Sequence, residues 1–233
     1  MFQTHVAAWP MTALALIAAW GVAPGGHDPA FAAPPTEGAG GTGSIEGTLT
    51  VKRPPPRRTA SPYPARGAQA PRQVQVVPAV VYLKGAVPGA AGGGEAASMA
   101  QRDTAFAPPV LVVKAGTSVG FPNADPFFHN VFSYSGPARF DLGRYPQGES
   151  KSVTFDEPGV VKIYCEVHDF MRAAVIVTDS GVHAVVSGDG RFSLSGLPAG
   201  TYTLVAWHPD VGQSETEVRV EEGRATRVDL SLG

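Results

Sequence analysis

The sequence predicts an all-β protein made of two sandwich domains. Short runs of alternating apolar and polar residues recur along the chain, Gly, Pro, Asn or Asp bounds nearly every run, and no long stretch has helical periodicity. The 28 glycines and 22 prolines favour many turns over long helices. A chain of 233 residues can hold one large β domain or two smaller ones.

Charge and cysteine content narrow the class of protein. A net charge of −2 indicates neither a nucleic-acid-binding protein nor a polyanionic tail. The chain contains one cysteine, so no intrachain disulfide is expected. In an exported protein, a lone cysteine is either a free thiol or a metal ligand.

Residues 1–32 have the features of an export signal. Val6–Ala23 is mostly apolar, and Ala30-Phe31-Ala32 has the small-x-small pattern of a cleavage site. The region before the apolar run has no Lys or Arg, so an uncleaved membrane anchor is the alternative. Pro10 and Gly21 shorten the apolar run below the roughly 20 residues of a comfortable span. We therefore expect a periplasmic or otherwise exported protein with no stable membrane span after cleavage.

Two strand regions are expected before residue 97. After a Pro/Gly/Thr linker at 33–43, Ser44–Lys52 alternates as a half-buried strand does. Arg53–Arg72 is rich in Pro and Arg and is expected to be an exposed loop. Val74–Lys84 is the second strand region, and the Gly/Ala-rich stretch Gly85–Ala97 is expected to be a flexible connection.

Strand signals become dense from residue 110 onward, as in a sandwich or small barrel. Between residues 110 and 178 we expect strands at Val110–Lys114, Ser118–Phe121, His129–Tyr134, Lys151–Phe155, Gly159–Cys165 and Ala173–Thr178. The C-terminal part continues with His183–Ser187, Arg191–Leu194, Gly200–Trp207, Glu215–Val220 and Thr226–Leu232. Asp189-Gly190 between two alternating runs is a strong hairpin signal.

One segment carries chemically distinctive residues at a distinctive spacing. Cys165, His168 and Met171 form a Cys-x2-His-x2-Met pattern in the loop between two expected strands, and His129 begins another strand 36 positions earlier. Two imidazoles, one thiolate and one weak axial thioether are the ligands of a mononuclear blue-copper site. Taken singly, each residue has an ordinary structural explanation, but the set matches copper in type, order and spacing.

Zinc is the competing metal. Zinc accepts Cys and His but gains little from a thioether, and structural zinc sites usually have four Cys or His ligands. With one cysteine in the chain, zinc would have a weaker ligand set than copper.

The same residues resemble plastocyanin-type cupredoxins. The resemblance rests on Phe121–Asp125, on His129-Asn130-Val131 and on the Cys165–Met171 loop, whose spacing is most similar to that of amicyanin. It covers roughly Ala97–Asp179 and implies a Greek-key sandwich. It also implies that His129, Cys165 and His168 are equatorial copper ligands, that Met171 is the axial ligand, and that the Asn130 side chain braces the Cys loop.

The chain departs from the amicyanin pattern at Asp169, where amicyanin has proline. The resemblance further implies that the edge of His168 reaches the surface. Pro126, Phe127 and Phe170 could then form an apolar docking patch, whereas we expect Phe128 to pack in the core.

The C-terminal part resembles a different family, the carboxypeptidase-regulatory-like, transthyretin-like sandwich. Its motifs are Gly188–Leu194 and Gly196–Leu204, and its opening strands resemble Ser44–Val51 and Val80–Leu83. We therefore expect a discontinuous domain, 44–94 plus 180–233, with a cupredoxin domain at 95–179 inserted in it.

The predicted function is that of an exported type 1 copper protein, not an enzyme, which transfers single electrons between redox protein partners. A copper oxidase or nitrite reductase would need further histidines, and after signal removal only His183 and His208 remain outside the proposed site. The other alternative is a copper-binding chaperone, storage or interaction protein with no electron-carrier role. We expect Trp207 to have a packing role.

Overall fold

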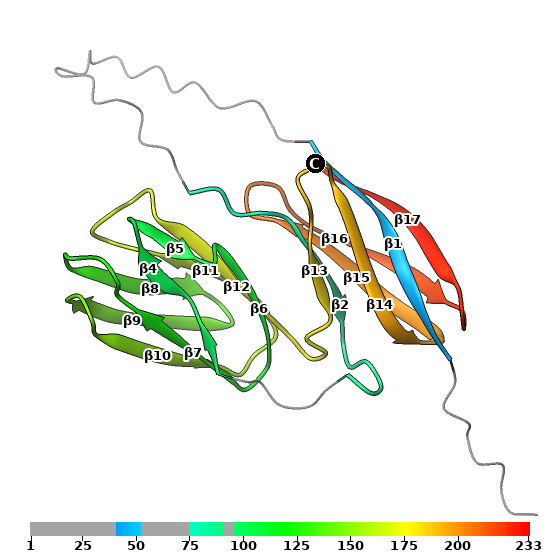
Figure 1. Ribbon diagram of the computed structural model, residues 1–233, viewed down its shortest axis with the longest axis horizontal. Helices are drawn as coiled ribbons and strands as arrows, with labels where there is room; N and C mark the ends of the chain where they lie inside the picture. The colour runs from blue at the N-terminus through cyan, green and yellow to red at the C-terminus, as the bar shows by residue number, and fades with distance from the viewer. Residues whose placement is uncertain (1–40, 53–74, 91–95) are drawn as a thin grey trace, which may run out of the picture. The chain divides into compact units, whose positions relative to one another are not determined.

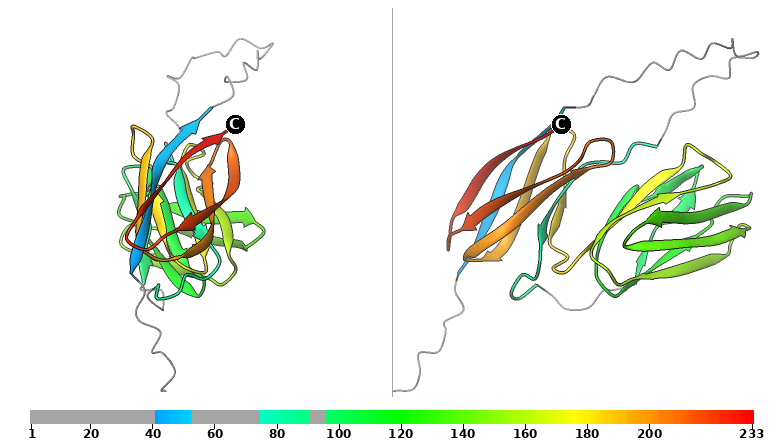
Figure 2. Two further views of the ribbon diagram at one scale, coloured as in Figure 1. Left: turned by 90° about the vertical axis from the view of Figure 1, so that its right-hand side faces the viewer. Right: turned by 180° about the vertical axis from the view of Figure 1, so that it is seen from behind.

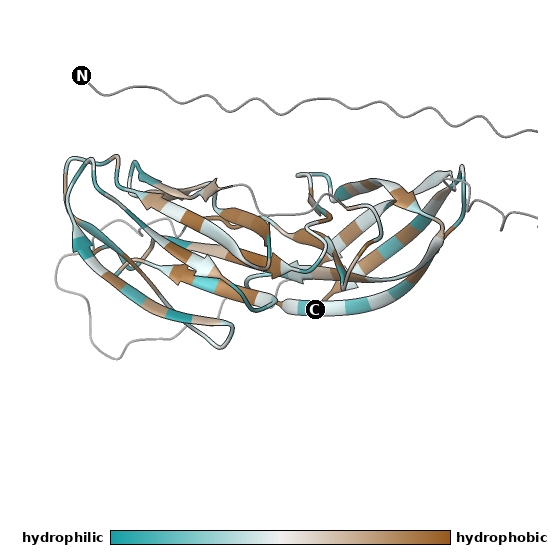
Figure 3. Ribbon diagram, turned by 90° about the horizontal axis from the view of Figure 1, so that it is seen from below, coloured by the Kyte–Doolittle hydropathy of each residue, from teal (hydrophilic) through white to brown (hydrophobic). Residues whose placement is uncertain are grey.

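The computed structural model describes residues 41–52, 75–90 and 96–233. Within these ranges every regular element is a β-strand, which confirms the predicted fold class (Figure 1). Hydrophobic and hydrophilic residues alternate along many strands, as expected where one face of a sheet meets a core (Figure 3). In the described part of the chain, no helix is long and apolar enough to cross a membrane. The expected signal at 1–32 and the loop at 53–72 lie outside the described residues.

The inserted sandwich, as we call β3 to β12, has one sheet of five strands in the order β6-β12-β11-β8-β9. The bounds of these strands are Val110–Lys114 (β6), Arg172–Thr178 (β12), Gly159–Tyr164 (β11), His129–Ser135 (β8) and Ala138–Tyr145 (β9). Strand β6 runs parallel to β12, whereas the other pairs are antiparallel.

A second, three-stranded sheet in the order β10-β7-β3 completes the inserted sandwich. It contains Ser150–Phe155 (β10), Thr117–Pro122 (β7) and Ala97–Ser98 (β3), and a small hairpin is formed by Ala100–Arg102 (β4) and Ala105–Ala107 (β5). The core of this sandwich includes Phe121, Val131 and Ile163 together with Cys165 and Met171. Cys165 and Met171, two of the candidate ligands, are therefore anchored in a packed interior.

The outer sandwich, as we call the remaining strands, also has two sheets, of orders β14-β1-β17 and β13-β2-β15-β16. Figure 2 shows its strands from two further directions. The strand bounds are Thr42–Val51 (β1), Val80–Lys84 (β2), His183–Val185 (β13), Arg191–Pro198 (β14), Gly200–His208 (β15), Gly212–Val220 (β16) and Ala225–Leu232 (β17). A Cβ atom on Gly47 of β1 would collide with the carbonyl of Val228, so glycine permits the close approach of β1 and β17.

The chain order of β2 and β13 is informative. These two strands pair antiparallel, with His183 opposite Tyr82 and Val185 opposite Val80, although the whole inserted sandwich lies between them in sequence. The backbone N–H of Leu83 also donates to the carbonyl of Val182. Strands β2 and β13 are therefore the two arms of a hairpin whose connection is the inserted sandwich.

Three details differ from the sequence-based expectations. Strand β1 begins at Thr42, two residues before the expected strand start at Ser44. Strand β2 begins at Val80 and not near Val74, because Pro78 has no N–H to donate to a sheet. Strands β3 and β9 and the β4–β5 hairpin were not expected at all.

Candidate metal centre

His129 is placed by the first residue of β8. It is fully buried and lies opposite Tyr145 in the antiparallel pairing of β8 with β9. Burial at a strand end fixes the ring, since both the backbone ladder and the surrounding core restrict its rotamers.

The loop between β11 and β12 carries the other three candidate ligands. Cys165 is a free, buried thiol directly after β11, and Met171 is fully buried directly before β12. His168 lies between them and is partly exposed. The N–H of Met171 donates to the carbonyl of His168 at 3.0 Å, which makes the loop a tight turn.

These side chains bring three donor atoms together. Nδ1 of His129 lies 3.1 Å from Nδ1 of His168 and 3.6 Å from Sγ of Cys165, and the three donor atoms are all within 4.8 Å of one another. Metal–imidazole bonds of roughly 2.0 Å and metal–thiolate bonds of roughly 2.3 Å let one ion reach atoms at such separations. Met171 belongs to the same core cluster as Cys165. His129, Cys165 and His168 are therefore assembled in one place.

Asn130 connects β8 to the loop. Its Oδ1 accepts a hydrogen bond from the N–H of Glu166 at 2.6 Å, and its Nδ2 lies 3.4 Å from Oδ1 of Asp141. Strand β11 pairs with β8 at a single position, Tyr164 opposite Phe132, so the asparagine continues the connection where the ladder stops. This contact is the brace that the resemblance implies.

Asp125 is a member of the site that sequence reasoning missed. Its Oδ2 lies 2.8 Å from Nε2 of His129, on the side of the ring opposite the converging donor atoms. Burial by itself raises the pKa of Asp125, but the N–H of Thr104, the His129 ring and the N–H of Asp103 hold it below its ordinary value. The available signal was the carboxylate four positions before His129; its partners on a distant turn were not predictable.

Tyr145 lies next to the centre, opposite His129 in the pairing of β8 with β9. Burial raises its pKa, the hydrogen bond from Gln101 opposes that shift, and the nearby Cys165 adds to it. The phenol therefore stays protonated and donates to the carbonyl of Phe121 at 2.8 Å. Tyr145 therefore places no negative charge near Cys165.

Aromatic rings flank His168 on the exposed side. The ring centroid of Phe127 lies 5.5 Å from that of His168, and the centroid of Phe170 lies 5.6 Å from it. Phe127 is 40% exposed and Phe128 is 56% exposed. The expectation that Phe128 packs in the core is wrong, because the loop before β8 turns this side chain outward.

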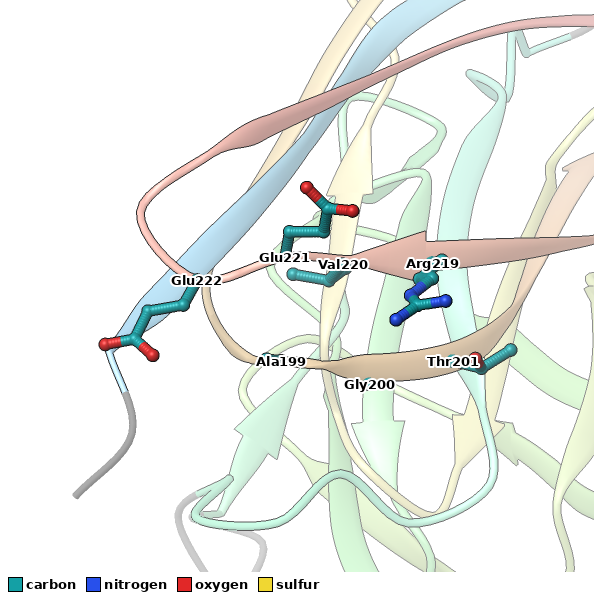
Figure 4. Close-up of a pocket in the computed structure, with 7 residues that line it drawn as sticks. All are labelled: Ala199, Gly200, Thr201, Arg219, Val220, Glu221 and Glu222. Atoms are coloured by element: carbon teal, nitrogen blue, oxygen red, sulfur yellow. The ribbon is translucent and has the colours of Figure 1, made fainter. Parts of the chain in front are cut away.

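A shallow hollow in the outer sandwich, of about 470 Å³, contains none of these residues (Figure 4). Glu221 and Glu222, which line it, point in different directions. Glu221 is paired with Arg224, and Glu222 accepts the N–H of Gly41. Both carboxylates therefore already have partners within the protein. Trp207 is buried, in keeping with the expected packing role.

Two imidazoles and a cysteine sulfur that converge, with a buried methionine in the same loop, match the ligand types of a blue-copper site. Residues 95–178 match the family of copper binding proteins that includes plastocyanin and azurin. Residues 170–233 match the carboxypeptidase regulatory-like domain.

Amicyanin-alpha of Methylorubrum extorquens is 33% identical to this chain over 75 residues. The matched region is 31% of this chain and 63% of that protein, so the chain spans about 63% of the length of this relative.

Among solved structures, a purple cupredoxin from Nitrosopumilus maritimus is 24% identical and matches 35% of this chain and 99% of its own, with a TM-score of 0.33. An amicyanin mutant in its oxidized state is 29% identical over 35% of this chain and 81% of its own, with a TM-score of 0.34. A copper-containing nitrite reductase from Thermus scotoductus is 27% identical over 40% of this chain and 25% of its own, with a TM-score of 0.35.

Proposed function

We propose that this chain is an exported type 1 copper protein that transfers single electrons between redox protein partners. The observation that carries the proposal is the convergence of Nδ1 of His129, Nδ1 of His168 and Sγ of Cys165, with the buried Met171 in the same short loop as Cys165 and His168. The match of residues 95–178 to a copper-binding family supports copper over zinc.

The four residues have distinct parts in this proposal. His129, Cys165 and His168 are the equatorial ligands, and Met171 is the weak axial ligand. When bound, one copper ion supplies a one-electron couple between Cu(I) and Cu(II). The thiolate and thioether favour the reduced ion, while the buried, hydrogen-bonded scaffold limits rearrangement between the two states. Asn130 holds the loop that carries Cys165.

Electrons would enter and leave through His168. It is the one member of the His129–Cys165–His168 cluster that is not buried, and it is bordered by the rings of Phe127 and Phe170. Phe128 and Val167 add exposed apolar surface near it in sequence. A small apolar patch suits brief encounters, because transient redox complexes use small interfaces.

The donor set favours a carrier over an enzyme. Catalytic metal sites keep an open position for water or substrate. Two imidazoles, a thiolate and a thioether leave little room for one. A copper chaperone or storage protein remains the second candidate; it would exchange the metal quickly and would lack a reversible redox couple.

The proposal also includes domain organisation and location. We propose that 44–94 and 180–233 form one carboxypeptidase-regulatory-like domain around a cupredoxin domain at 95–179. The pairing of β1 with β14 and β17, and of β2 with β13 and β15, supports this division. We assign 1–32 as an export signal, so the protein would work in the periplasm or an equivalent compartment.

Addition of one equivalent of Cu(II) to the purified chain tests the function. We expect an intense blue thiolate-to-copper band, narrow copper hyperfine splitting in the EPR spectrum and a reversible one-electron couple. All three should vanish in Cys165→Ala. A weakly absorbing protein with ordinary Cu(II) signals would contradict the carrier function and favour zinc binding or a structural role.

A further inference from the structure

The buried carboxylate of Asp125 faces the far nitrogen of a proposed copper ligand. Its Oδ2 is 2.8 Å from Nε2 of His129, and Asp125 itself is only 5% exposed. Nδ1 of His129 faces Cys165 and His168 and must be unprotonated to bind a metal. Nε2 therefore carries the ring proton and donates a hydrogen bond to the carboxylate.

The carboxylate is held from its other side by a turn. The N–H of Asp103 donates to Oδ1 of Asp125 at 2.7 Å, and the N–H of Thr104 donates to Oδ2 at 2.9 Å. Both residues lie in the tight turn that joins β4 to β5. Hydrogen bonds from consecutive backbone N–H groups to an ionised acceptor are strong, and they orient it.

The turn adopts an unusual backbone conformation to do this. Asp103 and Thr104 both have φ of 55°, the left-handed region in which a β-branched residue is rarely found. Two-residue hairpin turns of this kind usually contain Asn-Gly or Asp-Gly. Backbone strain of this sort persists only where surrounding contacts enforce it, and it clusters at functional sites.

A second set of contacts fixes the distance between this turn and the ligand. The N–H of Ala124 donates to the carbonyl of Gln101 at 2.9 Å, and Gln101 forms a β-bridge with Asn123. The Asn123 side chain accepts the N–H of Asp125 and donates to the carbonyl of Phe127. The hairpin and the loop before His129 are thus joined at several points.

We propose that Asp125, oriented by the Asp103-Thr104 turn, is a positioning residue that fixes the ring of His129 and lowers the reduction potential of the bound copper. The inference rests on the proposed function. A carboxylate behind a ligating histidine raises the basicity of the ring. Its negative charge favours the more highly charged Cu(II), so the one-electron reduction of Cu(II) to Cu(I) becomes less favourable.

Asp125→Asn is the principal test, because it keeps size and a hydrogen-bond acceptor but removes the charge. Loss of such a partner typically weakens metal binding 10- to 100-fold. We expect affinity for Cu(II) to fall about tenfold more than affinity for Cu(I), which raises the potential by about 59 mV in voltammetry. Asp156→Asn, an exposed residue between β10 and β11, makes the same charge change and should leave the potential unaltered.

Thr104→Pro tests the turn, since proline has no N–H and cannot adopt a positive φ. It should raise the potential on its own but add nothing in the Asp125→Asn background. Equal shifts in both backgrounds would overturn the role of the turn.

If Asp125→Asn did not fold, an unchanged potential in Thr104→Pro would overturn the inference and a raised one would support it. A colourless wild-type protein would contradict the proposed function. A blue wild-type protein with an unaltered potential in Asp125→Asn would overturn only this inference.

Discussion

At the scale of single residues, Met171 and Met99 form a natural matched pair. Both are fully buried and belong to the core cluster that contains Cys165, but only Met171 follows the ligand histidine in the loop. Replacement of either by leucine nearly conserves volume and should cost less than about 1.5 kcal/mol of unfolding free energy. Met171→Leu should also change the reduction potential of the copper-loaded protein, whereas Met99→Leu should not. Equal effects on the potential would contradict the axial role of Met171.

Phe128 gives a second residue-scale prediction. Phe128→Ala should slow electron self-exchange between oxidised and reduced copper-loaded copies by about tenfold, equivalent to about 1.4 kcal/mol of encounter energy. Line broadening in NMR spectra of mixed oxidation states measures this rate. Tyr134→Ala is the control, since Tyr134 is 68% exposed near the opposite end of β8 from His129. If both variants slowed exchange alike, the patch would have no special part in docking.

At the scale of elements, the Asn130 side chain provides a hydrogen bond from β8 to the backbone of the ligand loop. Asn130→Ala would leave the N–H of Glu166 without its acceptor, which we expect to cost about 1–3 kcal/mol in urea unfolding of the metal-free protein. Asn130→Asp retains the acceptor oxygen but sets a carboxylate oxygen against Asp141, so it should recover only part of that loss. Full recovery by leucine instead would mean that the position contributes only packing.

The sequence also predicted elements unevenly, for physical reasons. Runs such as Val110–Lys114 were found because a short apolar run bounded by Pro and Gly is typical of a buried strand. Strand β9 was missed although Ala138, Phe140 and Leu142 alternate with exposed residues, so its signal was present in the sequence. The hairpin strands β4 and β5 are each three residues long, too short for any period to show. The turn between them has neither Asn nor Gly, so the usual sequence signal of a two-residue hairpin was also absent.

Some features of the candidate site were likewise visible in the sequence and others were not. The spacing within Cys165–Met171 is local, and ligand chemistry alone made it visible. The link from Asp125 to Asp103 and Thr104 joins residues more than twenty positions apart through backbone N–H groups, which every residue type except proline offers. Residue identity could therefore not reveal it. The exposure of Phe128 likewise depends on the path of the loop and not on its hydrophobicity.

At the scale of the whole molecule, the stretch matched to the regulatory-like family, 170–233, is an incomplete sandwich. Strand β1 is central in the sheet β14-β1-β17, and β2 lies between β13 and β15. Both precede the inserted sandwich in sequence. A fragment of residues 170–233 lacks a central strand of each sheet, so we expect it to be unfolded by circular dichroism.

The matched design keeps those strands and removes the insertion. Replacing residues 85–180 by Asn-Gly joins Lys84 to Gly181 through a two-residue turn in the existing register of β2 and β13. We expect this shortened chain to show a β-sheet spectrum and a cooperative unfolding transition. An unfolded product would show that the outer sandwich does not fold without the inserted sandwich.

The hairpin formed by β2 and β13 has an entropic consequence. While the inserted sandwich is folded, its compact body limits how far the two arms can separate. Once it unfolds, residues 85–182 become one long flexible loop, and the entropy cost of closing the arms rises with the logarithm of loop length. An ion that binds only to the folded inserted sandwich raises the temperature at which that sandwich unfolds, by mass action. Copper held by one sandwich would thus keep an edge strand of the other in register.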